Sequence, residues 1–189
     1  QNRYGIHPLW WRCGDSTDYQ IFPGPARHQS FEPVFKKNYP ATLCTSVNNV
    51  VVHGVPTPYI LRSGDVLKID CGVVINGWYS DAALTIGVGK ISPKAQKLIK
   101  VTKIALEKGI AAAQAGNTVG DIGHAIGSFV KLNKMFTIKG LSGHGIGTDL
   151  HEPPSIYNEG ERGTGMKLEP GMVIAIEPMV ALGTSAIKQ

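Results

Sequence analysis

Cysteine is scarce in this sequence, and its few copies form no recognisable set. The 189 residues contain three cysteines, at Cys13, Cys44 and Cys71. Their wide spacing matches neither the C-x-x-C pairs of zinc sites nor the dense framework of small disulfide-stabilised secreted domains. Long apolar runs are also missing, because no stretch approaches the roughly 20 residues that a membrane-spanning helix needs. We therefore expect a reduced, cytoplasmic protein without a membrane segment.

Concentrated charge of one sign is missing as well. Lysine and arginine exceed aspartate and glutamate by 19 to 14, which gives a formal net charge of +5. The lysines are spread along the chain, and no basic tract alternates with aromatic side chains. A solvated surface explains them more simply than a specific nucleic-acid site does. Ordinary proportions of 42% hydrophobic and 17% charged residues fit one globular unit with a sizeable core.

Regular periodicity is lacking in the first 40 residues, which are dense in proline, glycine, arginine and aromatic residues. No helix or strand is assigned there. Strand-like sequence begins with residues 42–54, a run rich in β-branched residues that Asn48 and Asn49 interrupt. After residue 139 the chain returns to strands and glycine-rich loops, and the last strand lies in the apolar run 172–182.

Capping signals predict two helices in the middle of the chain. Ser92 is a suitable N-cap, Pro93 suits the first helical position, and Gly116 is the expected end of the first helix. Thr118 can cap the second helix, with Asp121 as its capping-box partner. Strands, then helices, then strands indicate an α+β architecture, an antiparallel sheet with covering helices.

An asparagine–glycine pair predicts a hairpin that brings two aspartates together. Asn76 and Gly77 favour a two-residue type I′ turn between two β-rich stretches. That register sets Gly72 opposite Asp81, so that Asp70 and Asp81 are diagonal neighbours on one face, roughly 7–8 Å apart. Two like charges on a mostly apolar face need neutralisation, and two metal ions bridged by one carboxylate fit the spacing. In the alternative, both aspartates point to solvent.

Two further segments carry candidate ligands. His144 lies in the glycine-rich run 143–147, where backbone could approach a metal or substrate closely, and His151 follows seven residues later. Either histidine alone is more often a structural residue than a ligand. Glu177 changes that balance because a carboxylate within an apolar strand needs a partner or a metal. His53 closes an apolar strand and is by itself weak evidence for a site.

Four segments together resemble a known enzyme family. They are TSVNNVVVHGVP (45–56), IDCGVVINGWYSDAALTIGVG (69–89), SGHGIGTDLHEPP (142–154) and VIAIEPMV (173–180). In this order and with these separations they resemble the signatures of the type I methionine aminopeptidases, which have the pita-bread fold. The resemblance extends from about residue 31 to 189. It implies one metallo-aminopeptidase catalytic domain over 31–189, with residues 1–30 unassigned and atypical of the family.

The resemblance implies a set of metal ligands. Asp70 would bind one divalent metal, and Asp81 would bridge two. His144 and Glu177 would complete the shell of the other metal. Mn, Fe, Co or Zn fit these donors, while Mg is the poorest match to a histidine ligand.

The resemblance also implies roles in catalysis and in substrate binding. Glu177 would accept a proton from the metal-activated water, and His151 would hydrogen-bond the scissile carbonyl and stabilise its developing charge. His53 would contact the substrate near the scissile amide. Tyr39 and Cys44 would line the pocket for the methionine side chain, where a soft, apolar lining suits a thioether.

One family feature is not found in the sequence. A fifth ligand, a bridging glutamate on a later strand, has no counterpart after Glu177. We therefore expect a catalytic domain that is incomplete at its C-terminus, binds at most one metal tightly and has feeble activity.

Two rival functions remain open at this point. A prolidase-type X-Pro peptidase shares the aspartates and the glycine-rich histidine segment, although the sequence around His53 and Glu177 favours the methionine enzyme. A non-catalytic pita-bread binding module is the second rival, and it would be expected to have lost metal ligands. The partners implied by the resemblance are N-terminal methionine peptides of nascent proteins and, transiently, the ribosome. We expect a cytoplasmic monomer.

Overall fold

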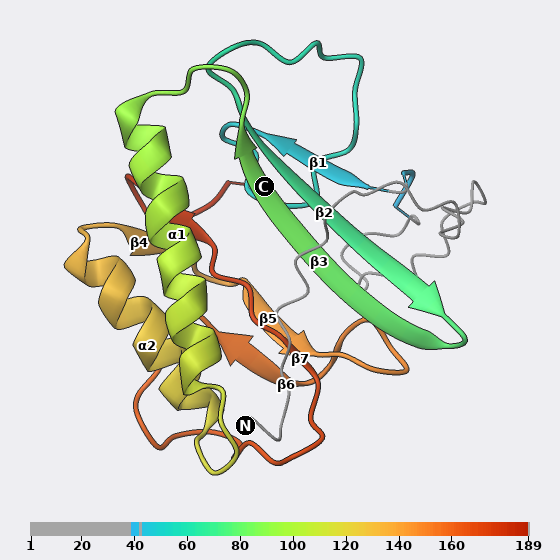
Figure 1. Ribbon diagram of the computed structural model, residues 1–189, viewed down its shortest axis with the longest axis vertical. Coiled ribbons are helices and arrows are strands. Elements are labelled where there is room, and N and C mark those ends of the chain that lie inside the picture. The colour runs from blue at the N-terminus through green and yellow to red at the C-terminus, as the bar shows by residue number, and fades with distance from the viewer. Residues whose placement is uncertain (1–38, 42, 189) are drawn as a thin grey trace, which may run out of the picture.

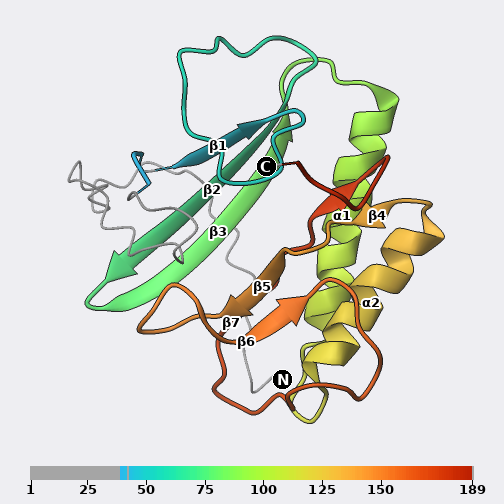
Figure 2. The ribbon, with the colours of Figure 1, turned by 180° about the vertical axis from the view of Figure 1, so that it is seen from behind.

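The computed structural model describes residues 39–41 and 43–188, and its strands lie against one side of two adjacent helices (Figures 1 and 2). One antiparallel sheet has the order β1-β2-β3, a second the order β6-β5-β7, and β4 pairs with β8. The elements are, in chain order, β1 (Cys44–Val47), β2 (Val66–Ile75), β3 (Trp78–Gly87), α1 (Pro93–Ala112), α2 (Val119–Leu132), β4 (Phe136–Thr137), β5 (Ser142–Gly145), β6 (Glu152–Tyr157), β7 (Ile174–Ala175) and β8 (Val180–Ala181).

The hairpin of β2 and β3 has the predicted turn and register. Asn76 and Gly77 both have positive φ, 53° and 83°, as a type I′ turn requires. Gly72 pairs with Asp81 along the ladder. The register prediction is thereby confirmed, and it sets Asp70 and Asp81 on the same face of the sheet.

Strand β1 is shorter than the sequence indicated. It ends at Val47, and Asn48 adopts φ of 51°. The Asn48 side chain bridges the next segment, donating to Oδ1 of Asp65 at 2.9 Å and accepting from the amide of Val66 at 2.9 Å. The predicted interruption at Asn48 and Asn49 is confirmed. The expectation that the strand resumes and runs to Gly54 is wrong, and these hydrogen bonds to residues 65 and 66 hold the chain in a turn.

Both helices begin where the capping signals predict. Ser92 accepts a hydrogen bond from the amide of Ala95, and Thr118 and Asp121 form the complete capping box. The expected end of the first helix at Gly116 is wrong, because α1 stops at Ala112.

One local and one tertiary hydrogen bond lie at that earlier end of α1. The side chain of Asn117 donates to the carbonyl of Ala112 at 2.9 Å, and the amide of Gly116 donates to Leu168 at 2.9 Å. These bonds turn the chain away after Ala112 before glycine is reached.

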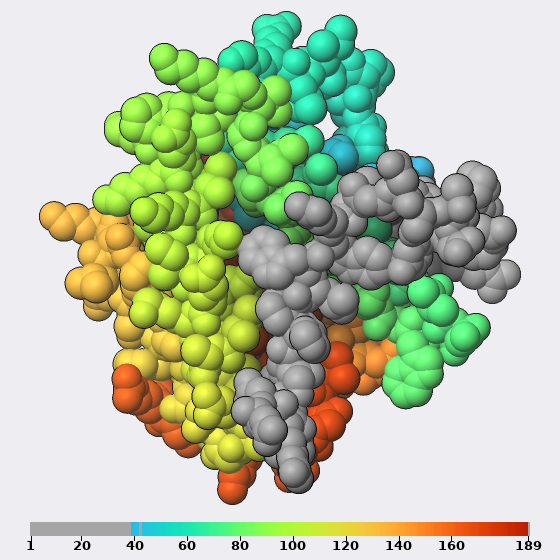
Figure 3. All heavy atoms as spheres, viewed as in Figure 1, coloured from blue at the N-terminus to red at the C-terminus, as the bar shows by residue number. Residues whose placement is uncertain are grey.

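The core lies between the two helices and the strand β6. Ile122, Ile126 and Val130 form the buried stripe of α2 and pack against Val101 of α1 and Ile156 of β6. The opposite face of α1 faces solvent, as the yellow-green helix in Figure 3 shows, and its lysines 94, 97, 100 and 103 are exposed. Within the described residues, no helix is long and apolar enough to cross a membrane.

The core assignment predicts unequal effects for two isoleucine substitutions. Ile126 is fully buried, whereas Ile60 is 82% exposed. We expect Ile126→Ala to destabilise the protein by about 2–5 kcal/mol, because it leaves a cavity between the helices. The matched variant Ile60→Ala should change the free energy of unfolding by less than about 0.5 kcal/mol. Urea denaturation measures both, and equal midpoint shifts would contradict this core.

Candidate metal centre

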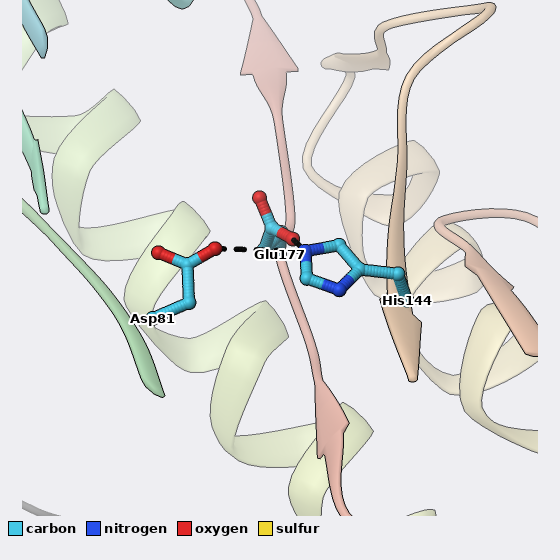
Figure 4. A group of neighbouring side chains, drawn as sticks. All are labelled: Asp81, His144 and Glu177. Atoms are coloured by element: carbon cyan, nitrogen blue, oxygen red, sulfur yellow. Dashed lines mark ion pairs between the residues drawn. The ribbon is translucent and has the colours of Figure 1, made fainter. Parts of the chain in front are cut away.

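Three side chains from separate segments meet at one point (Figure 4). Asp81 comes from β3, His144 from β5, and Glu177 from the segment between β7 and β8. Nε2 of His144 lies 3.5 Å from Oδ2 of Asp81 and 3.2 Å from Oε1 of Glu177. One ligand atom from each residue falls within 4.8 Å of the others, which is close enough for all three to bind one ion.

Glycines on either side of His144 hold β5 close to its two neighbours. A side chain at Gly143 would collide with the carbonyl oxygen of Ala175 in β7, and one at Gly145 with the carbonyl oxygen of Pro153 in β6. These glycines are expected to let backbone approach a metal or substrate, and that stays a prediction. They allow backbone to approach backbone, and so fix the strand from which His144 projects.

The imidazole of His144 is oriented by its own strand. Nδ1 lies 2.8 Å from the carbonyl oxygen of Gly145, an acceptor that fixes the proton on Nδ1. Nε2 then faces the two carboxylates. Burial opposes the charged ring, but hydrogen bonds to Asp81, Glu177 and Gly145 outweigh it and raise the pKa of His144 to about 10. Nε2 therefore carries either a proton or a metal ion between these carboxylates.

Asp70 lies beside this group rather than within it. It pairs with Ala83 of β3 and with Cys44 of β1, so its side chain shares a face with Asp81. Burial, followed by the charges of Asp81 and Glu177, raises the pKa of Asp70 to about 7. Such a shift is typical of carboxylates that share a site.

Glu177 presents a buried carboxylate oxygen to the cluster. Its Oε1 is buried and makes no well-directed hydrogen bond to the described residues, although Nε2 of His144 lies 3.2 Å away. Buried polar atoms are nearly always satisfied, so this oxygen calls for a cation, which either a protonated His144 or a bound metal supplies. Two carboxylates and one imidazole fit a divalent transition metal.

Two more histidines border the cluster. The ring of His151 meets that of His144 edge to face, with centroids 4.3 Å apart. His53 adopts φ of 55°, a left-handed conformation that is strained for a residue other than glycine. Burial lowers the pKa of both rings, and the charges of Glu177 and Asp81 oppose that decrease at each. Both are therefore neutral imidazoles beside the carboxylates.

Tyr39 and Cys44 lie on the β1 side of the same region. The hydroxyl of Tyr39 donates to the carbonyl of Gly54 at 2.7 Å, next to His53. Cys44 is buried opposite Asp70, and burial raises the pKa of its thiol. These two side chains connect β1 with the segment that carries His53.

Sequence reasoning missed two polar residues that support the site. Glu152 accepts hydrogen bonds from the hydroxyl of Thr148 and the amide of Asp149, and so organises the loop that presents His151. Its position directly after His151 was the available signal. Asn158 donates to the backbone of Glu177 from 19 residues away, and no local pattern indicates that contact.

Known proteins are similar to this chain in sequence and in fold. The sequence profile of metallopeptidase family M24 matches residues 24–188. The methionine aminopeptidase of Clostridium perfringens is 49% identical over 158 residues, 82% of this chain and 64% of that protein. The crystal structure of methionine aminopeptidase from Rickettsia prowazekii has a TM-score of 0.77 and 40% identity, covering 78% of this chain and 60% of that one. The prolidase from Pyrococcus horikoshii OT3 has a TM-score of 0.63 and 25% identity, covering 73% and 40%.

The chain thus spans less than two thirds of these relatives, 64% and 60% of the two methionine aminopeptidases. Its likeness to both the aminopeptidases and the prolidase confirms the α+β pita-bread fold. Because the matched profile covers nearly all of its length, the chain belongs to metallopeptidase family M24.

Proposed function

We propose that this protein is a metal-dependent aminopeptidase that removes N-terminal methionine from nascent proteins. The observation that carries the proposal is the convergence of Asp81, His144 and Glu177 from three segments. These three residues would hold one divalent metal, and Asp70 would extend the site on the side of Asp81. When bound, such a metal lowers the pKa of water and polarises a carbonyl, which is the chemistry of peptide hydrolysis.

The acid–base work is assigned to two side chains. Glu177 has a buried oxygen directed into the cluster and would accept the proton of the attacking water. His151 is kept neutral because burial lowers its pKa, so its ring can donate an N–H without carrying charge. It would hydrogen-bond the scissile carbonyl oxygen as negative charge develops there.

Substrate recognition is assigned to the side of the cluster that faces β1. His53 would contact the substrate near the scissile amide, where its left-handed backbone holds the ring beside the carboxylates. Tyr39 and the buried Cys44 would border the pocket for the methionine side chain. A thiol and an aromatic ring provide polarisable contacts for a thioether.

The donors do not select among Mn, Fe, Co and Zn, so any of these would serve as the metal, one or two per chain.

The cellular setting follows from the proposed substrate. We further propose a monomer that acts in the cytoplasm on nascent chains and associates transiently with the ribosome.

Both rival functions are less well supported. Identity is 40–49% to two methionine aminopeptidases but 25% to the prolidase, which favours methionine over an X-Pro substrate. A non-catalytic module would have no need to keep Asp81, His144 and Glu177 within reach of one ion. The enzyme is therefore the better account.

Peptide selectivity tests the proposed function. With Mn²⁺ or Co²⁺ added, the chain should release free methionine from Met-Ala-Ser, slowly, and should leave the dipeptide Ala-Pro intact. Chromatography of the released amino acids measures both reactions. Asp81→Asn should abolish methionine release, whereas Asp149→Asn, at an exposed loop position, should retain it. Preferential cleavage of Ala-Pro, or turnover that survives Asp81→Asn, would contradict the proposal.

The role of His151 predicts a separation of turnover from metal binding. His151→Ala removes the donor to the scissile carbonyl but no metal ligand, so kcat for Met-Ala-Ser should fall by about 10²–10³-fold. The affinity for Mn²⁺, measured by calorimetry, should stay within about threefold, since His151 would act on the substrate alone. A large loss of Mn²⁺ affinity in this variant would mean that His151 is a ligand instead.

A further inference from the structure

Asn158 is the donor that the structure provides to the backbone of Glu177. It follows β6 directly and is 2% exposed. Its Nδ2 donates to the carbonyl oxygen of Glu177 at 2.8 Å. This contact links the end of one strand to the residue whose carboxylate enters the cluster.

The segment around Glu177 needs such a contact because it lies outside the strand ladders. Residues 176–179 lie between β7 and β8 and are assigned to neither. Pro178 follows Glu177 and has no N–H to donate. The nearest ladder pairs are His144 with Ala175 on one side and Thr137 with Val180 on the other. Within this segment the carbonyl of Met179 accepts from the amide of Ile138 at 2.9 Å, and the carbonyl of Glu177 accepts from the side-chain amide of Asn158.

Burial of the Asn158 side chain makes an unfavourable contribution to folding stability. Its Oδ1 is buried and has no hydrogen-bond partner among the described residues. An unsatisfied buried acceptor is unfavourable, which offsets the gain from the single bond that Nδ2 makes. Net stability therefore does not explain an asparagine here, whereas a requirement at Glu177 does.

Asn158 is itself held by firm neighbours. A side chain on Gly127 of α2 would lie 2.9 Å from the carbonyl oxygen of Asn158, so helix and chain are in close contact. The next residue, Glu159, accepts a hydrogen bond from the hydroxyl of Thr137 in β4. Asn158 is therefore held between α2 and β4, and its hydrogen bond restricts the backbone of Glu177 in turn.

We propose that Asn158 is a positioning residue for the metal site: it fixes the backbone of Glu177 so that the carboxylate faces His144 and Asp81. The inference rests on the metal site proposed above and adds a residue that touches neither metal nor substrate. Hydrogen-bonded partners that orient a ligand commonly affect metal affinity by 10–100-fold (roughly) when removed.

Co²⁺ binding by the whole chain, followed by its visible absorption, tests this role. Asn158→Leu keeps the side-chain volume but removes the donor, and it should weaken Co²⁺ binding by about 10-fold. Asn133→Leu is the matched control, because Nδ2 of Asn133 also donates to a backbone carbonyl, that of Phe129 at 2.9 Å. That control should lower the unfolding midpoint and leave Co²⁺ affinity unchanged. If Asn158→Leu does not fold, Asn158→Ser, whose hydroxyl is too short to reach Glu177, should show the same loss.

A double variant separates positioning from general damage. In a Glu177→Ala background the carboxylate is gone, so Asn158→Leu should weaken Co²⁺ binding no further. Unchanged affinity in Asn158→Leu, an equal loss in Asn133→Leu, or an additive loss in the double variant would each overturn the inference. Absence of Co²⁺ binding by the unaltered chain would overturn the metal site itself, and this inference with it.

Discussion

The repulsion among carboxylates around His144 is the constraint on which the rest of the site depends. Asp81 and Glu177 approach the same imidazole nitrogen, and Asp70 lies close enough to feel both charges. Like charges in a half-buried place are unfavourable unless a cation lies between them. These carboxylates raise the pKa of His144, and together with burial, the larger cause, they raise the pKa of Asp70. A divalent metal bound by Nε2 and the carboxylates would neutralise the repulsion among these carboxylates.

The fold brings these charges together from segments that are far apart in sequence. A tight turn sets the register of β2 and β3 and thereby the position of Asp81. Gly143 and Gly145 bring β5 against its neighbours and fix His144. Glu177 has no ladder of its own and is held by the amide of Asn158. Each candidate ligand is thus positioned by a different feature: Asp81 by a turn, His144 by close backbone contacts, and Glu177 by a buried side-chain hydrogen bond.

The predictable parts of the structure were those decided by neighbours in sequence. The Asn76–Gly77 turn and the Thr118–Asp121 capping box depend on a few adjacent residues, so the hairpin register and both helix starts could be predicted. The two wrong ends were decided by distant partners, Leu168 at the end of α1 and Asp65 at the end of β1. A propensity pattern contains no information about such partners.

The same distinction applies to the candidate site. Glu177 could be picked out because a carboxylate in an apolar run is unusual, and His144 because of its glycine neighbours. The backbone contacts that those glycines allow could not be predicted, since the backbones they contact belong to other strands. Asn158 left no signal at all, because its partner is 19 residues away and an asparagine after a strand is common. Residues that bind can be suspected from type and pattern, whereas residues that position them require coordinates.

The position of a bound metal tests the central claim most directly. Crystals of the chain grown with Co²⁺, measured at the cobalt absorption edge, would locate the ion by its anomalous scattering. We predict that the strongest peak lies in bonding contact with Nε2 of His144 and with carboxylate oxygens of Asp81 and Glu177. A strongest peak elsewhere, or none between these three side chains, would contradict it.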